Sequence, residues 1–99
     1  MHKVKDLILR IFIIVDELIR NHTWAESSYY TDNLSHVAWR LKYYVEPRIE
    51  ELERIVGKKL EKCWKAYEDV LFWVNQNSIE ATKESIIALA KYVMLEPFE

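Results

Sequence analysis

Apolar residues recur along most of the chain at the three- and four-residue spacing of an α-helix. Placing each residue about 100° further round a helix puts the apolar positions of 47–75 within a stripe about 80° wide. That stripe keeps its phase through Gly57, which predicts one long amphipathic helix over 47–75. An alternative ends the helix at Gly57 and restarts it at Lys58, but no Ser, Asp or Asn lies nearby to cap a new helix. The stripe comprises Ile49, Leu52, Val56, Leu60, Cys63, Tyr67, Val70 and Val74.

The same spacing predicts three further helices, over 3–21, 33–45 and 79–95. The segment 3–21 is apolar almost all round, which is typical of a helix at the centre of a bundle. Glu46-Pro47 marks a boundary, because proline disfavours helical geometry in the residue before it and suits the first turn of a new helix. The expected fold is therefore an all-α, four-helix domain over residues 1–99, with an apolar central N-terminal helix and one long helix.

Composition agrees with this fold and narrows the function. One glycine and two prolines among 99 residues are too few for the turns of a strand-rich domain. A net charge of −2 argues against a dedicated nucleic-acid binder. The apolar run near the N-terminus is interrupted by Arg10 and ended by Asp16, so it is neither a secretory signal nor a membrane span. We expect a soluble, intracellular protein with no membrane span.

Residues that carry chemistry are sparse. The three histidines have no metal-ligand spacing relative to one another or to Cys63, and a single glycine permits no phosphate-binding loop. We therefore expect neither a metal nor a cofactor. His22 and Glu26 lie in the irregular segment 22–32 among several hydroxyl groups, the types used in acid–base catalysis. Ordinary capped loops contain the same types, so we expect no enzyme, and catalysis is the third hypothesis.

Large aromatic residues exceed what one core face can cover. Residues 70–74 are all apolar, so Phe72 and Trp73 cannot both face the core of the expected helix. Trp39 and Tyr43 lie on the side of their helix opposite its core positions. Either a neighbouring helix wraps around them, or they form a subunit or partner interface, where aromatics are enriched. The leading hypothesis is a non-enzymatic interaction or structural module that binds itself or another protein through these four residues.

An alternative is a small regulator that binds nucleic acid. A basic stripe on the expected long helix has the spacing to follow a phosphate backbone. Acidic residues at 50, 61 and 68 are interleaved with it and weaken its attraction for phosphate. The stripe consists of Arg54, Lys58, Lys62 and Lys65.

The length, the sparse glycine, the short connections, the dense Glu, Lys and Arg surface and the aromatic load together resemble a known group of proteins. These are small helical proteins of unknown function from filamentous viruses of hyperthermophilic archaea, the lipothrixvirus and rudivirus group. Abundant Lys and Glu with few Asn and Gln is a hyperthermophile tendency. The resemblance implies a hyperthermostable viral protein in the cytoplasm of a hot host, and it assigns no functional residue.

Overall fold

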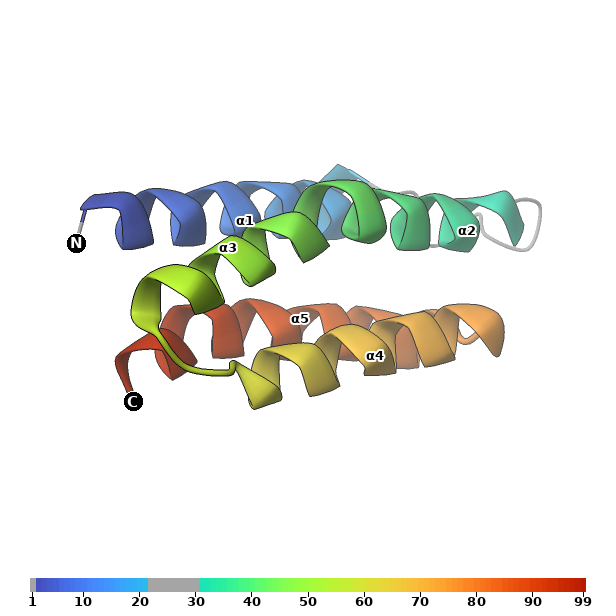
Figure 1. Cartoon of the computed structure of the whole chain (residues 1–99). Coiled ribbons are helices and arrows are strands. Elements are labelled where there is room, and N and C mark those ends of the chain that lie inside the picture. The colour runs from blue at the N-terminus through green and yellow to red at the C-terminus, as the bar shows by residue number, and fades with distance from the viewer. Residues whose placement is uncertain (1, 22–30) are drawn as a thin grey trace.

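Four helices in two layers make up the part of the chain that the computed structural model describes, residues 2–21 and 31–99 (Figure 1). One layer holds α1 (His2–Asn21) beside a long helix that consists of α2 (Thr31–Arg40), a π-helical turn (Leu41–Val45) and α3 (Glu46–Val56). The other layer holds α4 (Glu61–Asn75) and α5 (Ile79–Leu95), and α5 continues into a 3₁₀ turn, Glu96–Phe98. The expected all-α, four-helix fold is confirmed.

One core runs between the two layers, and every helix contributes one face to it. On α1 the spacing of three and four residues places Val4, Leu7, Ile11, Val15 and Leu18 on that face, each at most 5% exposed. The opposite side of α1 is open, because Leu9 and Ile13 remain 56% and 53% exposed. The expectation that other helices surround α1 is therefore wrong, because a two-layer arrangement covers the inner side of each helix and leaves its outer side exposed.

Pro47 does not end a helix, contrary to the boundary expected at Glu46-Pro47. Arg40, Val45 and Glu46 all have right-handed helical backbones, so the chain is helical without a break from Thr31 to Val56. The π turn just before Pro47 explains this. Its hydrogen bonds join residues five apart instead of four, so the helix continues past the position where proline has no N–H to donate. Glu46 N–H donates to the carbonyl of Leu41, and the Arg48 guanidinium donates to the carbonyl of Tyr44 at 2.6 Å.

The π turn also suits the spacing of the buried residues. Val37, Leu41, Val45 and Ile49 follow one another at intervals of four and are all fully buried. Three such intervals would turn the stripe by about 120° away from the core in a regular helix of about 3.6 residues per turn. An extra residue in the turn reduces that drift, so the same stripe stays on the core across Pro47.

The long helix expected over 47–75 is wrong, because the chain breaks at Gly57. Gly57 has a left-handed backbone (φ 73°, ψ 25°), and its N–H donates to the carbonyl of Glu53 at 2.9 Å. α4 begins only at Glu61 and lies in the other layer (Figure 1). The alternative break at Gly57 is therefore the correct one, although the new helix starts three residues later than Lys58. The buried stripe survives the break because each half packs on the shared core.

The turn between α4 and α5 satisfies the last carbonyls of α4. Asn77 has a positive φ of 58°, its N–H donates to Val74, and the N–H of Ser78 donates to Trp73. These two bonds form a Schellman motif, the common C-terminal stop of a helix. Ser78 is the N-cap of α5, and its carbonyl accepts bonds from both the N–H and the hydroxyl of Thr82.

Candidate interaction surfaces

An aromatic cluster lies where α2 meets the π turn. The Trp39 ring stacks on His36 with centroids 6.2 Å apart, and it lies 5.1 Å from the Tyr43 ring and 5.9 Å from the Tyr44 ring. Trp39 and Tyr43 are 49% and 56% exposed. They occupy the side of the helix opposite the buried residues Val37 and Leu41, so no described helix covers them. The rings hold one another in a defined arrangement on the surface.

Cations extend this cluster. The Arg40 guanidinium lies 5.8 Å from the Tyr44 ring centroid, and Lys42 Nζ lies 6.0 Å from that of Tyr43. Both separations are within reach of a cation–π attraction. Arg40 also donates to Glu17 on α1 at 3.1 Å, which ties α2 to α1. The contact between Arg40 and Glu17 therefore holds the cluster against α1, while Trp39 and Tyr43 remain exposed to solvent.

A second aromatic pair lies near the end of α4. Phe72 and Trp73 meet edge to face, with centroids 4.9 Å apart. Phe72 is 53% exposed and lies opposite the buried stripe of α4, while Trp73 is partly buried. The side of α4 that carries Phe72 is thus left uncovered by the helices described.

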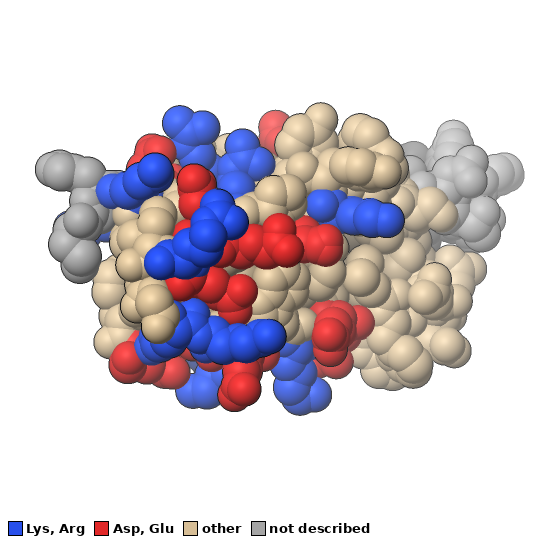
Figure 2. Space-filling view, viewed as in Figure 1, with Lys and Arg blue, Asp and Glu red and all other residues tan. Residues whose placement is uncertain are grey.

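Charge is distributed unevenly over the face of the molecule that Figure 2 shows. Lys, Arg, Asp and Glu gather over α3 and the first half of α4, whereas the surface over α2 and the second half of α4 carries few charges (Figure 2). The sequence agrees, since 33–39 and 70–79 contain no Lys, Arg, Asp or Glu. We call Trp39, Tyr43, Phe72 and Trp73, the four residues expected from the sequence, the aromatic surface. Phe72 and Trp73 lie within the uncharged stretch 70–79, whereas Trp39 and Tyr43, on a helix in the other layer, have Arg40 and Lys42 beside them.

The basic stripe expected on one long helix is divided by the break at Gly57. Arg54 stays on α3, while Lys62 and Lys65 belong to α4 and Lys58 to the connection. Lys58 Nζ donates to the main-chain oxygen of Glu99 at 2.5 Å, and Lys62 pairs with the Glu99 carboxylate at 2.9 Å. This carboxylate raises the pKa of Lys62, through its hydrogen bond first and its charge second. Two of the four cations therefore contact the end of α5's extension rather than a shared, open surface.

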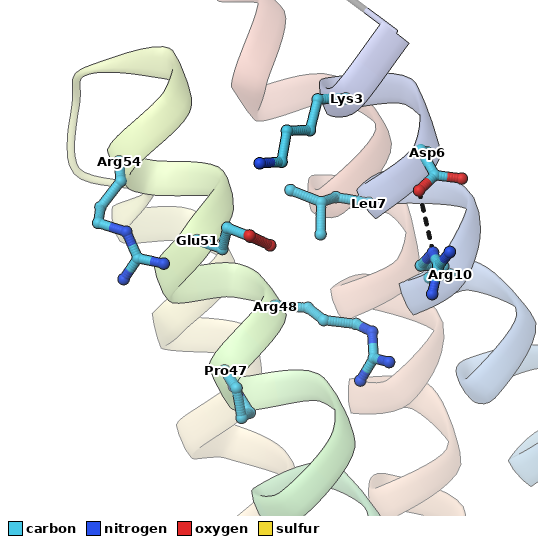
Figure 3. Close-up of a pocket in the computed structure, with 8 residues that line it drawn as sticks. All are labelled: Lys3, Asp6, Leu7, Arg10, Pro47, Arg48, Glu51 and Arg54. Atoms are coloured by element: carbon cyan, nitrogen blue, oxygen red, sulfur yellow. Dashed lines mark hydrogen bonds and ion pairs between the residues drawn. The ribbon is translucent and has the colours of Figure 1, made fainter.

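Arg54 instead borders a depression of about 400 Å³ between α1 and α3. Lys3 and Arg48 extend into the space between the two helices, and Glu51 points from α3 towards α1 (Figure 3). Arg10 is held by Asp6 on the same helix at 3.0 Å. The lining therefore mixes four cations with two carboxylates: Lys3, Arg10, Arg48, Arg54, Asp6 and Glu51.

An apolar groove lies between α1 and the C-terminal end of α5, and sequence reasoning did not identify it. It measures about 400 Å³ and is lined by Lys5, Ile8, Leu9, Phe12, Met94 and Phe98. Leu9, Met94 and Phe98 are each about half exposed. The signal in the sequence is the apolar character of α1 on all sides, which suits a helix beside a groove as well as a central helix.

Two glutamates organise the start of α4. Glu96, only 6% exposed, accepts the N–H groups of Lys62 and Cys63 at 2.9 and 2.8 Å. Glu53 accepts the N–H of Leu60 at 2.7 Å and the indole N–H of Trp64 at 2.9 Å. Burial alone would raise the pKa of Glu96, but the two N–H groups, together with the Cys63 side chain and the charge of Lys62, outweigh burial and lower the pKa below its usual value. These carboxylates therefore act as helix caps.

Three further features considered from the sequence are a metal site, a membrane span and a catalytic pair. Among residues 2–21 and 31–99, no three His, Cys, Asp or Glu side chains group as metal ligands would. No helix in these ranges combines the length and apolar character needed to cross a membrane. His22 and Glu26, the residues of the catalytic hypothesis, lie outside the described residues.

Comparison of the chain with protein-family models, with curated proteins and with solved structures gave no match. The resemblance to proteins of archaeal viruses therefore stays a prediction. The function has to be inferred from the surfaces themselves.

Proposed function

We propose that the protein is a non-enzymatic interaction module that associates with other copies of itself through the aromatic surface. The observation that supports this most is the state of Trp39 and Tyr43. Both are about half exposed, and their rings are already packed against each other, with Lys42 at the edge of the Tyr43 ring. Aromatic side chains of this kind are the usual anchors of protein interfaces.

The magnitudes favour a weak and reversible association. A half-exposed aromatic side chain presents about 100 Å² of mainly apolar surface. Covering it contributes about 2.5 kcal/mol, so Trp39 and Tyr43 from two copies would together supply about 10 kcal/mol. Association costs about 4–15 kcal/mol in lost translation and rotation. Because the rings are held by one another, little further side-chain entropy is lost, and association at micromolar or higher concentration is expected.

Sedimentation velocity and light scattering from about 1 to 500 μM test this proposal. The mean mass of the wild type should rise with concentration, and the Trp39→Ser, Tyr43→Ser double variant should lower it. Ile55→Ser is the matched control, since Ile55 is an exposed apolar residue on α3 outside the aromatic surface. A mass that is the same for wild type and double variant at every concentration would refute association through this surface.

A second candidate function is binding to nucleic acid. It is supported by the depression of Figure 3, where Arg54 lies with three other cations. The two carboxylates in the lining weaken this support, because they reduce the local positive potential. A gel shift with short duplexes at about 20 mM salt tests it, since backbone contacts are strongest at low salt. No shift under these conditions, or the same shift with Arg48→Gln, Arg54→Gln, would end this hypothesis.

A further inference from the structure

The outer sides of α1 and α5 form an apolar patch distinct from the aromatic surface. α1 and α5 pack against each other and belong to different layers. On α1 we take the exposed apolar residues Leu9, Phe12 and Ile13, and on α5 and its 3₁₀ extension Ile87, Met94 and Phe98. Leu95 is also exposed (49%), but it lies about 100° further round α5 than Met94 and is not counted here. We call these six residues the α1–α5 patch. Their exposed fractions range from 38% to 56%.

The area of this patch supplies more than half of one side of a standard interface. With about 150 Å² for a fully exposed side chain of this size, the low end of the range for aromatic residues, six half-exposed ones present about 450 Å². That lies within the range for the largest apolar patch on a typical monomer, about 300–600 Å². A standard interface buries about 800 Å² on each partner. The patch and a polar rim therefore reach the size of a dimer interface, which scattered exposed residues would not.

The pattern on α1 is self-complementary. Lys5, Leu9, Phe12 and Asp16 succeed one another at spacings of four, three and four, which places them on one side of the helix. When two copies of a helix run antiparallel about a two-fold axis, residue i of one copy lies opposite residue j of the other. The sum i + j is then the same for every such pair. An axis between Arg10 and Ile11 gives a sum of 21, so it places Leu9 opposite Phe12 of the second copy, Lys5 opposite Asp16, and Ile8 opposite Ile13.

The charged residues at the edge of the α1–α5 patch also favour a second copy of the chain as the binding partner. Lys5 borders the groove and is exposed, and Asp16 exposes 42% of its side chain. Arg20 of the same helix donates to Asp16 Oδ1 at 2.9 Å, and a carboxylate has further acceptor sites. A membrane surface is a poorer occupant, because binding to anionic lipid needs a clear excess of cations around the apolar area. Here Lys5 and Arg20 face Asp16, which leaves an excess of only one cation.

We propose that this face binds a second copy of the chain as a two-fold symmetric dimer. The two α1 helices run antiparallel, and Leu9 and Phe12 of each copy fill the groove between α1 and Met94 and Phe98 of the other. Lys5 of each copy pairs with Asp16 of the other at the two ends of the contact. A closed two-fold interface of this kind uses the same patch on both subunits. The aromatic surface stays outside this dimer and is free to join dimers to one another.

The first test removes the apolar contact in a background that lacks the aromatic one. The Trp39→Ser, Tyr43→Ser variant should remain a dimer in sedimentation equilibrium. Adding Leu9→Glu and Met94→Glu should weaken dimerisation by at least about 100-fold, since four charges enter an apolar contact. Adding Ile55→Glu instead is the control and should leave the dimer intact. Circular dichroism and thermal unfolding check that each variant folds.

The second test examines the register. Lys5→Glu alone should weaken the dimer about tenfold, because two attractive pairs become repulsive. The double variant Lys5→Glu, Asp16→Lys should recover most of the lost affinity, since the exchanged charges face each other again; recovery is incomplete because Asp16→Lys also removes the partner of Arg20. Recovery supports the antiparallel contact, because Lys5 and Asp16 are eleven residues apart on one helix, about 16 Å, and do not contact each other within one copy. A double variant no tighter than Lys5→Glu overturns this register.

The results separate the two proposals. A background variant that is monomeric at about 500 μM overturns the α1–α5 dimer and leaves association through the aromatic surface in place. A dimer that tolerates Leu9→Glu and Met94→Glu, or binding of the monomer to anionic vesicles through these residues, also overturns it. A wild type that never exceeds a dimer, and whose dimer needs Leu9 and Met94 but not Trp39, supports the α1–α5 contact and refutes the aromatic one.

Discussion

The cap that Glu96 provides for α4 is the most direct point at which to perturb this fold. Glu96 comes from the 3₁₀ turn after α5, yet it accepts the N–H groups of Lys62 and Cys63, 34 and 33 residues earlier. Replacing Glu96 by alanine removes both acceptors from a site that is only 6% exposed. The first turn of α4 then has two amide groups without a protein partner.

The expected loss of stability follows from these two bonds. Loss of an ordinary N-cap costs about 1 kcal/mol, and hydrogen bonds to a charged acceptor contribute about 1.5–3 kcal/mol each. Since water can reach part of a helix terminus, we expect about 3 kcal/mol in total for Glu96→Ala. For a domain of this size that corresponds to a fall in Tm of about 12–24 °C. Glu96→Gln keeps one acceptor oxygen and should lose about half as much.

Guanidinium unfolding followed by circular dichroism measures these differences. Glu84→Ala is the matched control, because Glu84 is exposed on α5. Its loss should change stability by less than about 0.5 kcal/mol, the usual range for surface substitutions. A loss for Glu96→Ala that lies within about 0.5 kcal/mol of the loss for Glu84→Ala would refute the cap, because the two bonds would then contribute nothing net.

The pH dependence of the same variants checks the charge on Glu96. The two N–H groups hold the pKa of Glu96 below its usual value of about 4.5 despite burial. A depressed pKa in the folded state means that the carboxylate stabilises the fold above the unfolded pKa and loses that contribution as the pH falls through the folded value. The stability difference between wild type and Glu96→Gln should therefore be constant from pH 7 to 5 and shrink below pH 4.5. A difference that grows in acid would contradict this assignment.

Three further predictions concern the connections and the core. Gly57 has a left-handed backbone, and a Cβ there would meet nothing within 4 Å. Gly57→Ala should therefore cost about 1–2 kcal/mol in denaturant unfolding, the cost of that backbone alone; Gly57→Asn should cost clearly less, and equal losses would argue against this cause. Asn77→Gly should be neutral or stabilise by up to about 1 kcal/mol, whereas Asn77→Ala should destabilise, because left-handed backbone favours glycine; the same unfolding assay decides. Burial, followed by the nearby Glu96, raises the pKa of the Cys63 thiol. Cys63 should therefore resist a thiol reagent at pH 8 and react fully in guanidinium, and rapid labelling of the native protein would contradict its burial.

Much of the helical content can be predicted from the sequence, because it follows from the spacing of apolar residues along the chain. The bounds of α1 and α5 agree with prediction to within one residue. Of the apolar positions that give α1 its helical spacing, Leu7, Ile11, Val15 and Leu18 are buried, Ile8 and Ile19 are partly buried, and Phe12 is 38% exposed. The candidate aromatic residues can also be found, since a helix of about 3.6 residues per turn cannot direct five consecutive apolar residues to one core. Trp39, Tyr43 and Phe72 are exposed, although the sequence does not show which helices lie beside them.

Prediction fails where a distant group acts on the backbone. The break at Gly57 is disfavoured from the sequence because no residue near Lys58 can cap a new helix, and the cap is supplied by Glu96 from the other end of the chain. Pro47 predicts a boundary, but a π turn carries the helix past it. The unbroken apolar spacing from Val37 to Ile49 is the signal for continuity.

The sequence alone determined which side of each helix is apolar, because the periodicity of side chains depends only on the local backbone. It also determined that aromatic side chains would exceed the core. Only the tertiary structure decided where the chain turns, since a helix end is stable when its free N–H and C=O groups find partners, and at the start of α4 those partners lie far away in sequence. The tertiary structure likewise decided which apolar sides remain uncovered, because packing in two layers gives α1 an outer face beside α5.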